Sequence, residues 1–160
     1  MKDIELVNFV DLSLDEKKMI LEWRNNKSVR EWMYTQDEIS MEIHLEFMDS
    51  LKLSKDRVYF LVKKDSADIG VINFTNLFES DIYFGLYANP NTKMLGVGRV
   101  LEEISIDYAF NILKVKRLKL EVFEDNIKVR NLHKKYGFKE SGEKIINSRK
   151  VICMEFKNEY

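Results

Sequence analysis

Apolar positions recur along this chain with two different periods, and the periods predict its secondary structure. Spacings of three and four residues predict four helices, over about 13–24, 40–53, 97–112 and 126–136. Apolar runs and period-two alternation, separated by short polar turns, predict the strands. The predicted strands cover 4–9, 58–63, 69–75, 82–88, 118–123, 138–146 and 149–156. The predicted order is therefore βααβββαβαββ.

This order predicts an α/β (α+β) protein. The three central strands should form an antiparallel meander, and the last two a hairpin about Asn147-Ser148. The strands on either side of the 97–112 helix should be parallel neighbours, because a helical crossover joins them. The prediction is a mixed, largely antiparallel sheet of about seven strands with helices on both faces. The chain has no repeats and one proline, Pro90, so a single domain over 1–160 is expected.

Charge and cysteine usage narrow the class of protein. The chain has 26 basic and 27 acidic residues, well interspersed, which indicates neither a nucleic-acid partner nor an anionic membrane surface. Charges within 1–6 and the absence of a long apolar run favour a cytoplasmic protein. The single cysteine, Cys153, lies in an apolar run and is predicted to be a small core residue of a protein from a reducing compartment.

A glycine-containing turn, Lys93 to Arg99, precedes the 97–112 helix. Gly96 and Gly98 allow the main chain to approach a ligand closely, and the helix start adds free N–H groups. The turn therefore predicts an anion site. It lacks the features of ATP and NAD loops, which favours another phosphate compound. Basic residues at 114–119 and at 134–135 form either a solvated face or a contact for a phosphorylated cofactor.

Together, the element order, the K-x-x-G-x-G turn and Asn126-x10-Gly137-Phe138 resemble the GNAT superfamily of acetyl-CoA-dependent N-acetyltransferases, over essentially the whole chain. The family usually has Gln or Arg where this chain has Lys93. The resemblance implies acetyl-CoA as co-substrate, bound without a metal. It also implies a GNAT fold.

The resemblance places the cofactor on main-chain groups. The amides of 95–99 would hold the pyrophosphate, and residues 86–88 would bind the pantetheine arm like an added strand. Asn126 would contact that arm, or it would serve only as a helix N-cap. The cofactor-binding residues so implied are Leu86, Tyr87, Ala88, Lys93, Met94, Leu95, Gly96, Val97, Gly98, Arg99, Asn126 and Lys135.

Acetyl transfer needs an acid that protonates the departing thiolate, and a base for the attacking ammonium. The family often has a tyrosine acid seven residues after the helix asparagine, where this chain has His133. A phenol, with a pKa of about 10, is protonated at pH 7, whereas an imidazole, near 6.5, mostly is not. His133 is therefore either the donor or a core residue, and Tyr136 is a second candidate acid. Glu121 and His44 are the candidate bases, acting through a water; a surface glutamate paired with a lysine is the alternative for Glu121.

Residues before the meander should shape the acceptor pocket. They resemble the N-acetyltransferases of pseudaminic acid biosynthesis, which acetylate the 4-amino group of a UDP-linked 4-amino-4,6-dideoxy-N-acetylhexosamine. Arg24 could pair with a phosphate, Trp32 and Tyr34 could stack on base or sugar, and Met33 could fit the 6-deoxy methyl. His44 could reach a phosphate or the amine. Each residue also has a structural alternative: a helix-end cation for Arg24, the core for Trp32, Met33 and His44, and the surface for Tyr34.

The expected mechanism is direct attack by the amine in a ternary complex with a small UDP-amino-sugar, and a homodimer is compatible with the sequence. Two other functions stay open. A protein N-terminal or ribosomal-protein acetyltransferase would share the cofactor loop. A catalytically silent acyl-CoA-binding regulator is the other, because histidine replaces the usual tyrosine acid.

Overall fold

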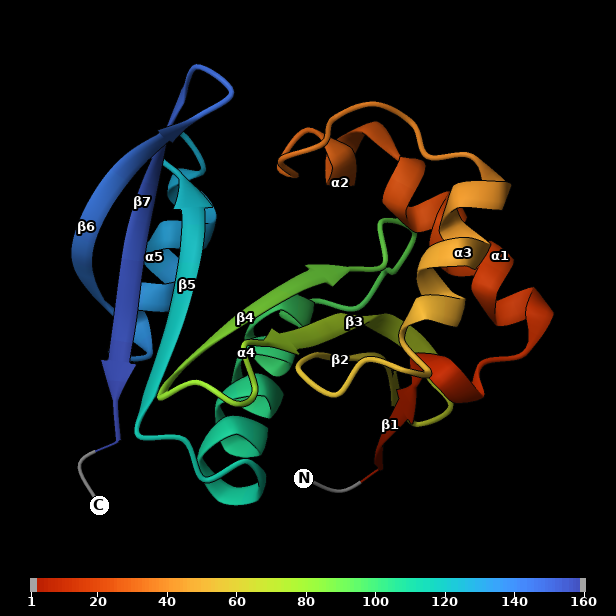
Figure 1. Cartoon of the computed structure of the whole chain (residues 1–160), viewed down its shortest axis with the longest axis horizontal. Helices are drawn as coiled ribbons and strands as arrows, with labels where there is room; N and C mark the ends of the chain where they lie inside the picture. The colour runs from red at the N-terminus through yellow and green to blue at the C-terminus, as the bar shows by residue number, and fades with distance from the viewer. Residues whose placement is uncertain (1–2, 159–160) are drawn as a thin grey trace.

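The computed structural model, which describes residues 3–158, has one seven-stranded sheet in the order β1-β2-β3-β4-β5-β7-β6 (Figure 1). The helices are α1 (Leu14–Asn25), α2 (Lys27–Arg30), α3 (Met41–Ser50), α4 (Val97–Asp107) and α5 (Ile127–Lys135). The strands are β1 (Ile4–Asn8), β2 (Val58–Lys64), β3 (Ala67–Thr75), β4 (Asp81–Ala88), β5 (Arg117–Phe123), β6 (Lys139–Ile146) and β7 (Arg149–Lys157). None of the helices within 3–158 combines the length and apolarity needed to cross a bilayer.

The sheet buries apolar side chains on both faces, in agreement with the helices predicted on both faces. On one face, Phe84, Leu118 and Leu120 pack with Leu101 and Ile104 of α4. The opposite core joins α1 and α3 to the sheet and contains Phe9, Ile20, Trp23, Met48, Leu61 and Val71. The two cores give the predicted layers, with α4 and α5 covering one face and α1 to α3 the other (Figure 1).

β4 and β5 are parallel neighbours, as predicted, but they pair over only part of their lengths. The register runs from Asp81↔Arg117 to Tyr83↔Lys119 and then stops. Beyond this point β4 remains paired with β3, and β5 remains paired with β7. The two strands therefore diverge into a V, which opens toward α2 and the β6–β7 hairpin (Figure 1).

The predicted elements agree with the structure except where a segment is short or irregular. The short helix α2 has too few residues to show a period, and the pattern does not predict it. The helix predicted over 97–112 changes to a π-helical turn at Tyr108–Ile112, where the Leu113 N–H donates to the Tyr108 carbonyl. The helix predicted over 40–53 ends at Ser50.

Two sequence predictions need correction. Cys153 is half-buried rather than in the core, because β7 turns it to the face opposite its buried neighbours Ile152 and Met154. Asn126 occupies the N-cap position of α5, but its side chain makes no capping hydrogen bond.

Gly137, which follows α5, is closely packed at the end of that helix. Its φ of 104° suits glycine, and a Cβ there would lie 2.7 Å from the Phe156 ring, which packs against the Phe138 ring. We expect Gly137→Ala to lower the free energy of unfolding by about 2 kcal/mol, measured by urea denaturation. Gly142→Ala is the control, because nothing lies within 4 Å of the position that its Cβ would occupy. Equal stability of the two variants would contradict the prediction.

Candidate active site

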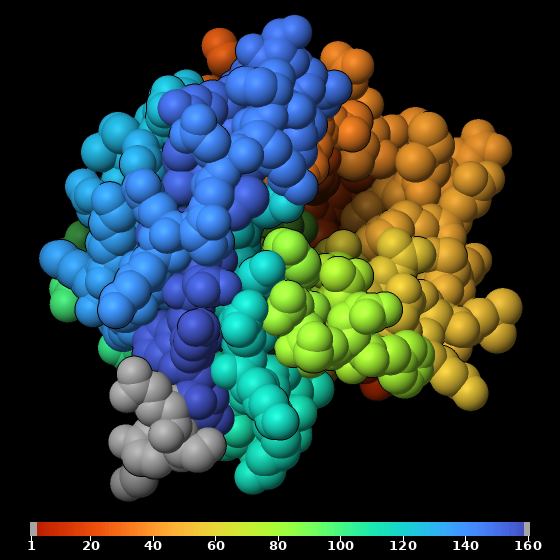
Figure 2. Space-filling view, turned by 60° about the vertical axis from the view of Figure 1, so that its left-hand side comes forward, coloured from red at the N-terminus to blue at the C-terminus, as the bar shows by residue number. Residues whose placement is uncertain are grey.

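The gap between β4 and β5 is the structural basis of the candidate site. From Phe84 to Ala88, the edge of β4 that faces β5 has no strand partner. Such an edge offers main-chain donors and acceptors to an extended ligand. Leu86, Tyr87 and Ala88, the residues expected to bind a pantetheine arm, lie on this edge. Figure 2 shows the surface dipping between the blue β6–β7 region and the orange and yellow helices.

The glycine turn forms the start of α4, directly after β4 and its loop. Gly96 has a φ of 75° and is the N-cap residue, with no side-chain cap. The first helical hydrogen bond is donated by the Val100 N–H to the Gly96 carbonyl, so the N–H groups of the first turn lack helical acceptors. Leu95 is 95% exposed. The local geometry is that of an anion site made from main-chain groups.

Other predicted cofactor contacts surround this turn or lie on α5. Lys93 and Arg99 lie beside the turn, whereas Met94 and Val97 are partly buried against the core. Lys135 is exposed in the last turn of α5. The neighbouring Lys134 pairs with Glu140.

Two basic residues of the 114–119 segment are also paired. Arg117 and Lys119 both contact Asp81. Together with the Lys134 ion pair, these contacts favour the solvated-face interpretation of the basic residues.

His133 lies inside the protein, beside the point where the V begins. It is 5% exposed, and its Nδ1 lies 2.7 Å from the Glu102 Oε1. Its ring makes edge contacts with Phe84 and Phe138. Phe84 is the first β4 residue beyond the last β4–β5 pair. His133 is therefore a core residue that also borders the gap. Its position agrees with both interpretations of the sequence, as a core residue and as a proton donor.

Tyr136, the second candidate acid, has a different environment. Its hydroxyl donates to Glu103 Oε1 over 2.7 Å at the surface, and this hydrogen bond raises the pKa of Tyr136. The Tyr136 hydroxyl is thus occupied by a hydrogen bond to a surface carboxylate, and we assign Tyr136 no catalytic role.

Glu121 lies on the opposite face of the sheet from His133. Its two carboxylate oxygens accept from the Tyr34 hydroxyl and from the Lys144 ammonium. Burial, and then the hydrogen bond to Glu121, raises the pKa of Tyr34, so the phenol stays protonated. The lysine pairing expected of a surface strand glutamate is present, but the Glu121 side chain is only 18% exposed. Cys153 lies opposite Glu121 on β7, and burial raises the pKa of its thiol.

The segment 31–40, between α2 and α3, carries three of the predicted acceptor residues, Trp32, Met33 and Tyr34, and is held through its main chain. The Arg149 guanidinium donates to the Glu31 carbonyl and stacks 3.6 Å from the Phe123 ring centroid. The Asn147 side chain donates to the Tyr34 carbonyl over 3.0 Å. Asn147 and Arg149, both from the β6–β7 hairpin, thus hold this segment at the open end of the V.

Arg24 holds the same segment from the other side. Its Nη2 donates to the Thr35 carbonyl over 3.0 Å, while Nη1 is buried and has no hydrogen-bond partner within the described chain. Desolvation lowers the pKa of the guanidinium. Trp32 is 36% exposed, so its alternative as a core residue is wrong, and Met33 is half-buried.

His44 connects two helices instead of facing the acceptor segment. Its Nε2 lies 2.8 Å from the Lys17 carbonyl of α1, and the residue is 6% exposed. Burial lowers the pKa of this imidazole, so it is neutral at pH 7 with Nε2–H as the donor. This environment corresponds to the structural alternative, and we assign His44 no catalytic or acceptor-binding role.

Four residues near the site are not predicted from the sequence. The pattern places Lys144, Asn147 and Arg149 only within a hairpin, because their partners are distant in sequence. Glu102 has a detectable signal: it lies beside Leu101 on the buried side of α4, with Ser105 one turn later. A charge at that position is unusual enough to be noticed.

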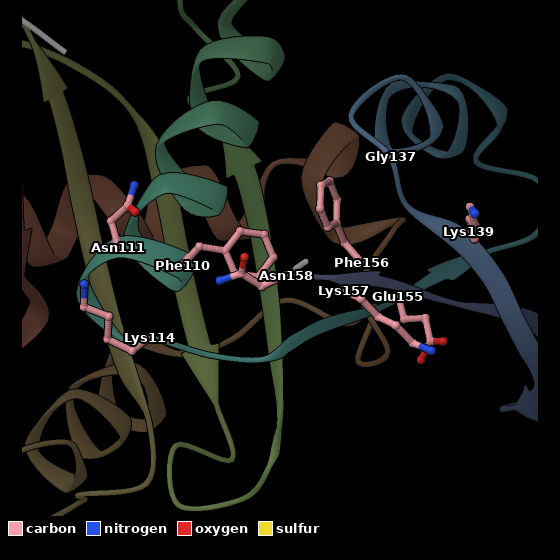
Figure 3. A pocket seen from close by; sticks show the side chains of 9 residues that line it. All are labelled: Phe110, Asn111, Lys114, Gly137, Lys139, Glu155, Phe156, Lys157 and Asn158. Atoms are coloured by element: carbon pink, nitrogen blue, oxygen red, sulfur yellow. The ribbon is translucent and has the colours of Figure 1, made fainter. Parts of the chain in front are cut away.

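A separate surface hollow of about 1020 Å³ lies between the π-helical turn and the last strands (Figure 3). Its lining includes Phe110, Phe156 and the basic residues Lys114, Lys139 and Lys157. Apart from Lys114, which belongs to the basic residues at 114–119, none of the predicted site residues contributes to it. The residues within 3–158 also contain no cluster of His, Cys, Asp or Glu suited to a metal ion.

Comparison with known proteins shows the family to which the chain belongs. The family model for the acetyltransferase (GNAT) domain matches residues 7–139. The chain belongs to the GNAT family, and it is an acetyltransferase.

Two relatives narrow the comparison. The chain is 42% identical over 135 residues, 84% of each protein, to acetyltransferase PseH of Campylobacter jejuni subsp. jejuni serotype O:23/36 (strain 81-176). A crystal structure of Campylobacter jejuni N-acetyltransferase PseH in complex with acetyl coenzyme A matches with a TM-score of 0.79 and 35% identity, covering 97% of this chain and 99% of that one. Spermidine N-acetyltransferase from Vibrio cholerae matches in fold, with a TM-score of 0.86, 20% identity, and coverage of 98% and 96% of the two chains.

Arg149→Ala tests the anchoring of the acceptor segment. The substitution removes the hydrogen bond to the Glu31 carbonyl and the stacking on Phe123, so residues 31–35 should lose their fixed position. We expect the KM for the amine acceptor to rise about tenfold, with little change in the KM for the acetyl donor.

Lys150→Ala is the matched control for this experiment. Lys150 is the next residue on β7 and pairs only with Glu124 and Glu143 among the described ion pairs. A parallel rise in both KM values of Arg149→Ala, or the same effect in Lys150→Ala, would contradict specific anchoring.

Proposed function

We propose that this acetyltransferase moves the acetyl group of acetyl-CoA to the 4-amino group of a UDP-linked 4-amino-4,6-dideoxy-N-acetylhexosamine, in pseudaminic acid biosynthesis. The observation that carries the proposal is the 42% identity to PseH over 84% of both chains. The complex of the related structure with acetyl coenzyme A supports the donor. The reaction is direct attack by the amine in a ternary complex.

On this proposal acetyl-CoA binds along the free edge of β4. The main-chain amides of 95–99 hold the pyrophosphate, and residues 86–88 hydrogen-bond the pantetheine arm. Asn126 contributes a side chain that no capping bond occupies. Lys93, Arg99 and Lys135 supply charge for the phosphates. The thioester then lies near Phe84, where β4 and β5 separate.

The acceptor binds on the face of the sheet that carries Glu121. Lys144, whose side chain is 47% exposed, is the partner that the incoming ammonium replaces at the Glu121 carboxylate. Glu121 accepts the proton, directly or through a water, while the Tyr34 hydroxyl keeps the carboxylate oriented. The free amine attacks the thioester carbon, the nitrogen gives up its second proton to water, and the C–S bond breaks as the tetrahedral intermediate collapses. His133 protonates the departing thiolate.

Nucleotide and sugar recognition is assigned to the segment 31–40 and α1. The buried Nη1 of Arg24 lacks a partner within the described chain and is suited to a phosphate oxygen. Trp32 and Tyr34 present partly exposed rings for a base or sugar face. Met33 is assigned to the apolar 6-deoxy methyl.

A substrate panel tests the proposal. Release of coenzyme A thiol from acetyl-CoA should be robust with a UDP-4-amino-4,6-dideoxy sugar and weak with peptides bearing free N-termini. Turnover on peptides alone would favour a protein acetyltransferase. Absence of turnover despite binding of acetyl-CoA would favour the silent regulator.

Glu121→Gln tests the base. The amide keeps the size and a hydrogen bond from Tyr34 but cannot accept the proton, so kcat should fall by about 10²- to 10⁴-fold. Glu124→Gln, on a carboxylate that pairs with Lys150 at the surface, is the matched control and should leave kcat unchanged. Steady-state kinetics on the UDP-amino-sugar measures both, and an active Glu121→Gln enzyme would exclude Glu121 as the base.

A further inference from the structure

A buried carboxylate next to His133 has no role in the reaction as described above. Glu102 has an exposure of 0%, and its Oε1 contacts the His133 Nδ1 at 2.7 Å. Its Oε2 is buried without a hydrogen-bond partner in the described chain. The other buried polar residue on α4, Ser105, is satisfied by the Leu101 carbonyl of the same helix.

Stability alone does not account for this pair. Two ionisable groups in an apolar interior lose hydration, and apolar residues of similar size often stabilise a fold as well or better. The His133 ring is enclosed by Phe84 and Phe138, which provide no polar compensation. Enclosed ionisable pairs of this kind concentrate at functional sites.

We propose that Glu102 is a positioning residue that holds His133 as the proton donor to the departing thiolate. The inference rests on the proposed function, because it assigns the same site its acid. With Nδ1–H directed to the Glu102 carboxylate, the imidazole ring is fixed and Nε2 is the nitrogen left for the ligand. Contact with Phe84 places the ring where β4 leaves β5.

The proton transfer balances with the groups named. In the proposed step the donor is the imidazolium, which carries one proton on Nδ1, donated to Glu102, and one on Nε2. When the C–S bond breaks, its electron pair passes to sulfur, and the Nε2 proton moves to the thiolate. His133 is then neutral with Nδ1–H still donated to Glu102, and its Nε2 takes up a proton from solvent before the next turnover.

The position of Glu102 on α4 connects the proposed acid, His133, to the proposed pyrophosphate site at the start of the same helix. Glu102 lies five residues after Val97, so a helical rise of 1.5 Å per residue puts it about 7.5 Å along the axis from the N-terminus. The helix whose first turn faces the pyrophosphate therefore also sets the position of the Glu102–His133 dyad. A fixed diphosphate and a fixed imidazole define the distance that the pantetheine arm must span.

A double-mutant cycle tests the proposal. Glu102→Gln should lower kcat about 10- to 100-fold with less than about a twofold change in the KM for acetyl-CoA. In the His133→Gln background, the same substitution should have no further effect on kcat. His133→Tyr, which restores the acid usual in the family, should regain activity and be insensitive to Glu102→Gln. Ser105→Ala, also buried on α4, is the control with wild-type kcat.

Two further readouts separate catalysis from folding and from the choice of acceptor. Thermal unfolding shows whether each variant is folded at the assay temperature; a lowered Tm with unchanged kcat in Glu102→Gln would overturn the proposal. NMR of the ¹⁵N-labelled imidazole should show the His133 Nε2 resonance shifted on addition of coenzyme A. An unshifted resonance would overturn the dyad even if the UDP-amino-sugar is a substrate, whereas a shift without sugar turnover would overturn only the acceptor assignment.

Discussion

The separation of β4 from β5 after three paired residues is the constraint on which the rest of the site depends. Beyond that point each strand keeps its other neighbour, so the sheet remains continuous while two facing edges are left unpaired. The loop after β4 then leads directly into α4, whose free N–H groups lie at the end of that unpaired edge. A fully paired sheet would have neither the free edge at which the pantetheine arm is proposed to bind nor the opening between two faces.

Because side chains alternate along a strand, the candidate acid and the candidate base lie on opposite faces of the sheet. On β4, Phe84 points to the α4 and α5 side, where His133 and Glu102 lie. On β5, Glu121 points the opposite way, toward Tyr34 and the acceptor segment. The candidate acid and the candidate base thus approach the gap from opposite sides of one sheet. This division keeps a buried, apolar environment for one and a polar, partly exposed environment for the other.

Local patterns are sufficient to predict most of the fold. The seven strands, the parallel pair and the glycine turn all follow from period and turn chemistry over short stretches, and the structure and comparisons confirm the GNAT fold. Long-range pairings are not predictable: Tyr34 and Glu121 are 87 positions apart, and Arg149 reaches back to Glu31. His44 shows why residue type alone misleads, since its spacing fits a site as well as the helix contact it makes. The ligand roles assigned by resemblance stay predictions.

The anchoring of the acceptor segment has an evolutionary consequence. Arg24, Asn147 and Arg149 all donate to carbonyl oxygens of the segment, which every amino acid possesses, and Arg149 in addition lies 5.7 Å from the centroid of the Trp32 ring. A substitution at 33 therefore leaves these hydrogen bonds in place, whereas a substitution of Trp32 also removes its ring contact with Arg149. On the proposed function, such an architecture allows acceptor preference to diverge between lineages while the free edge of β4 stays unchanged.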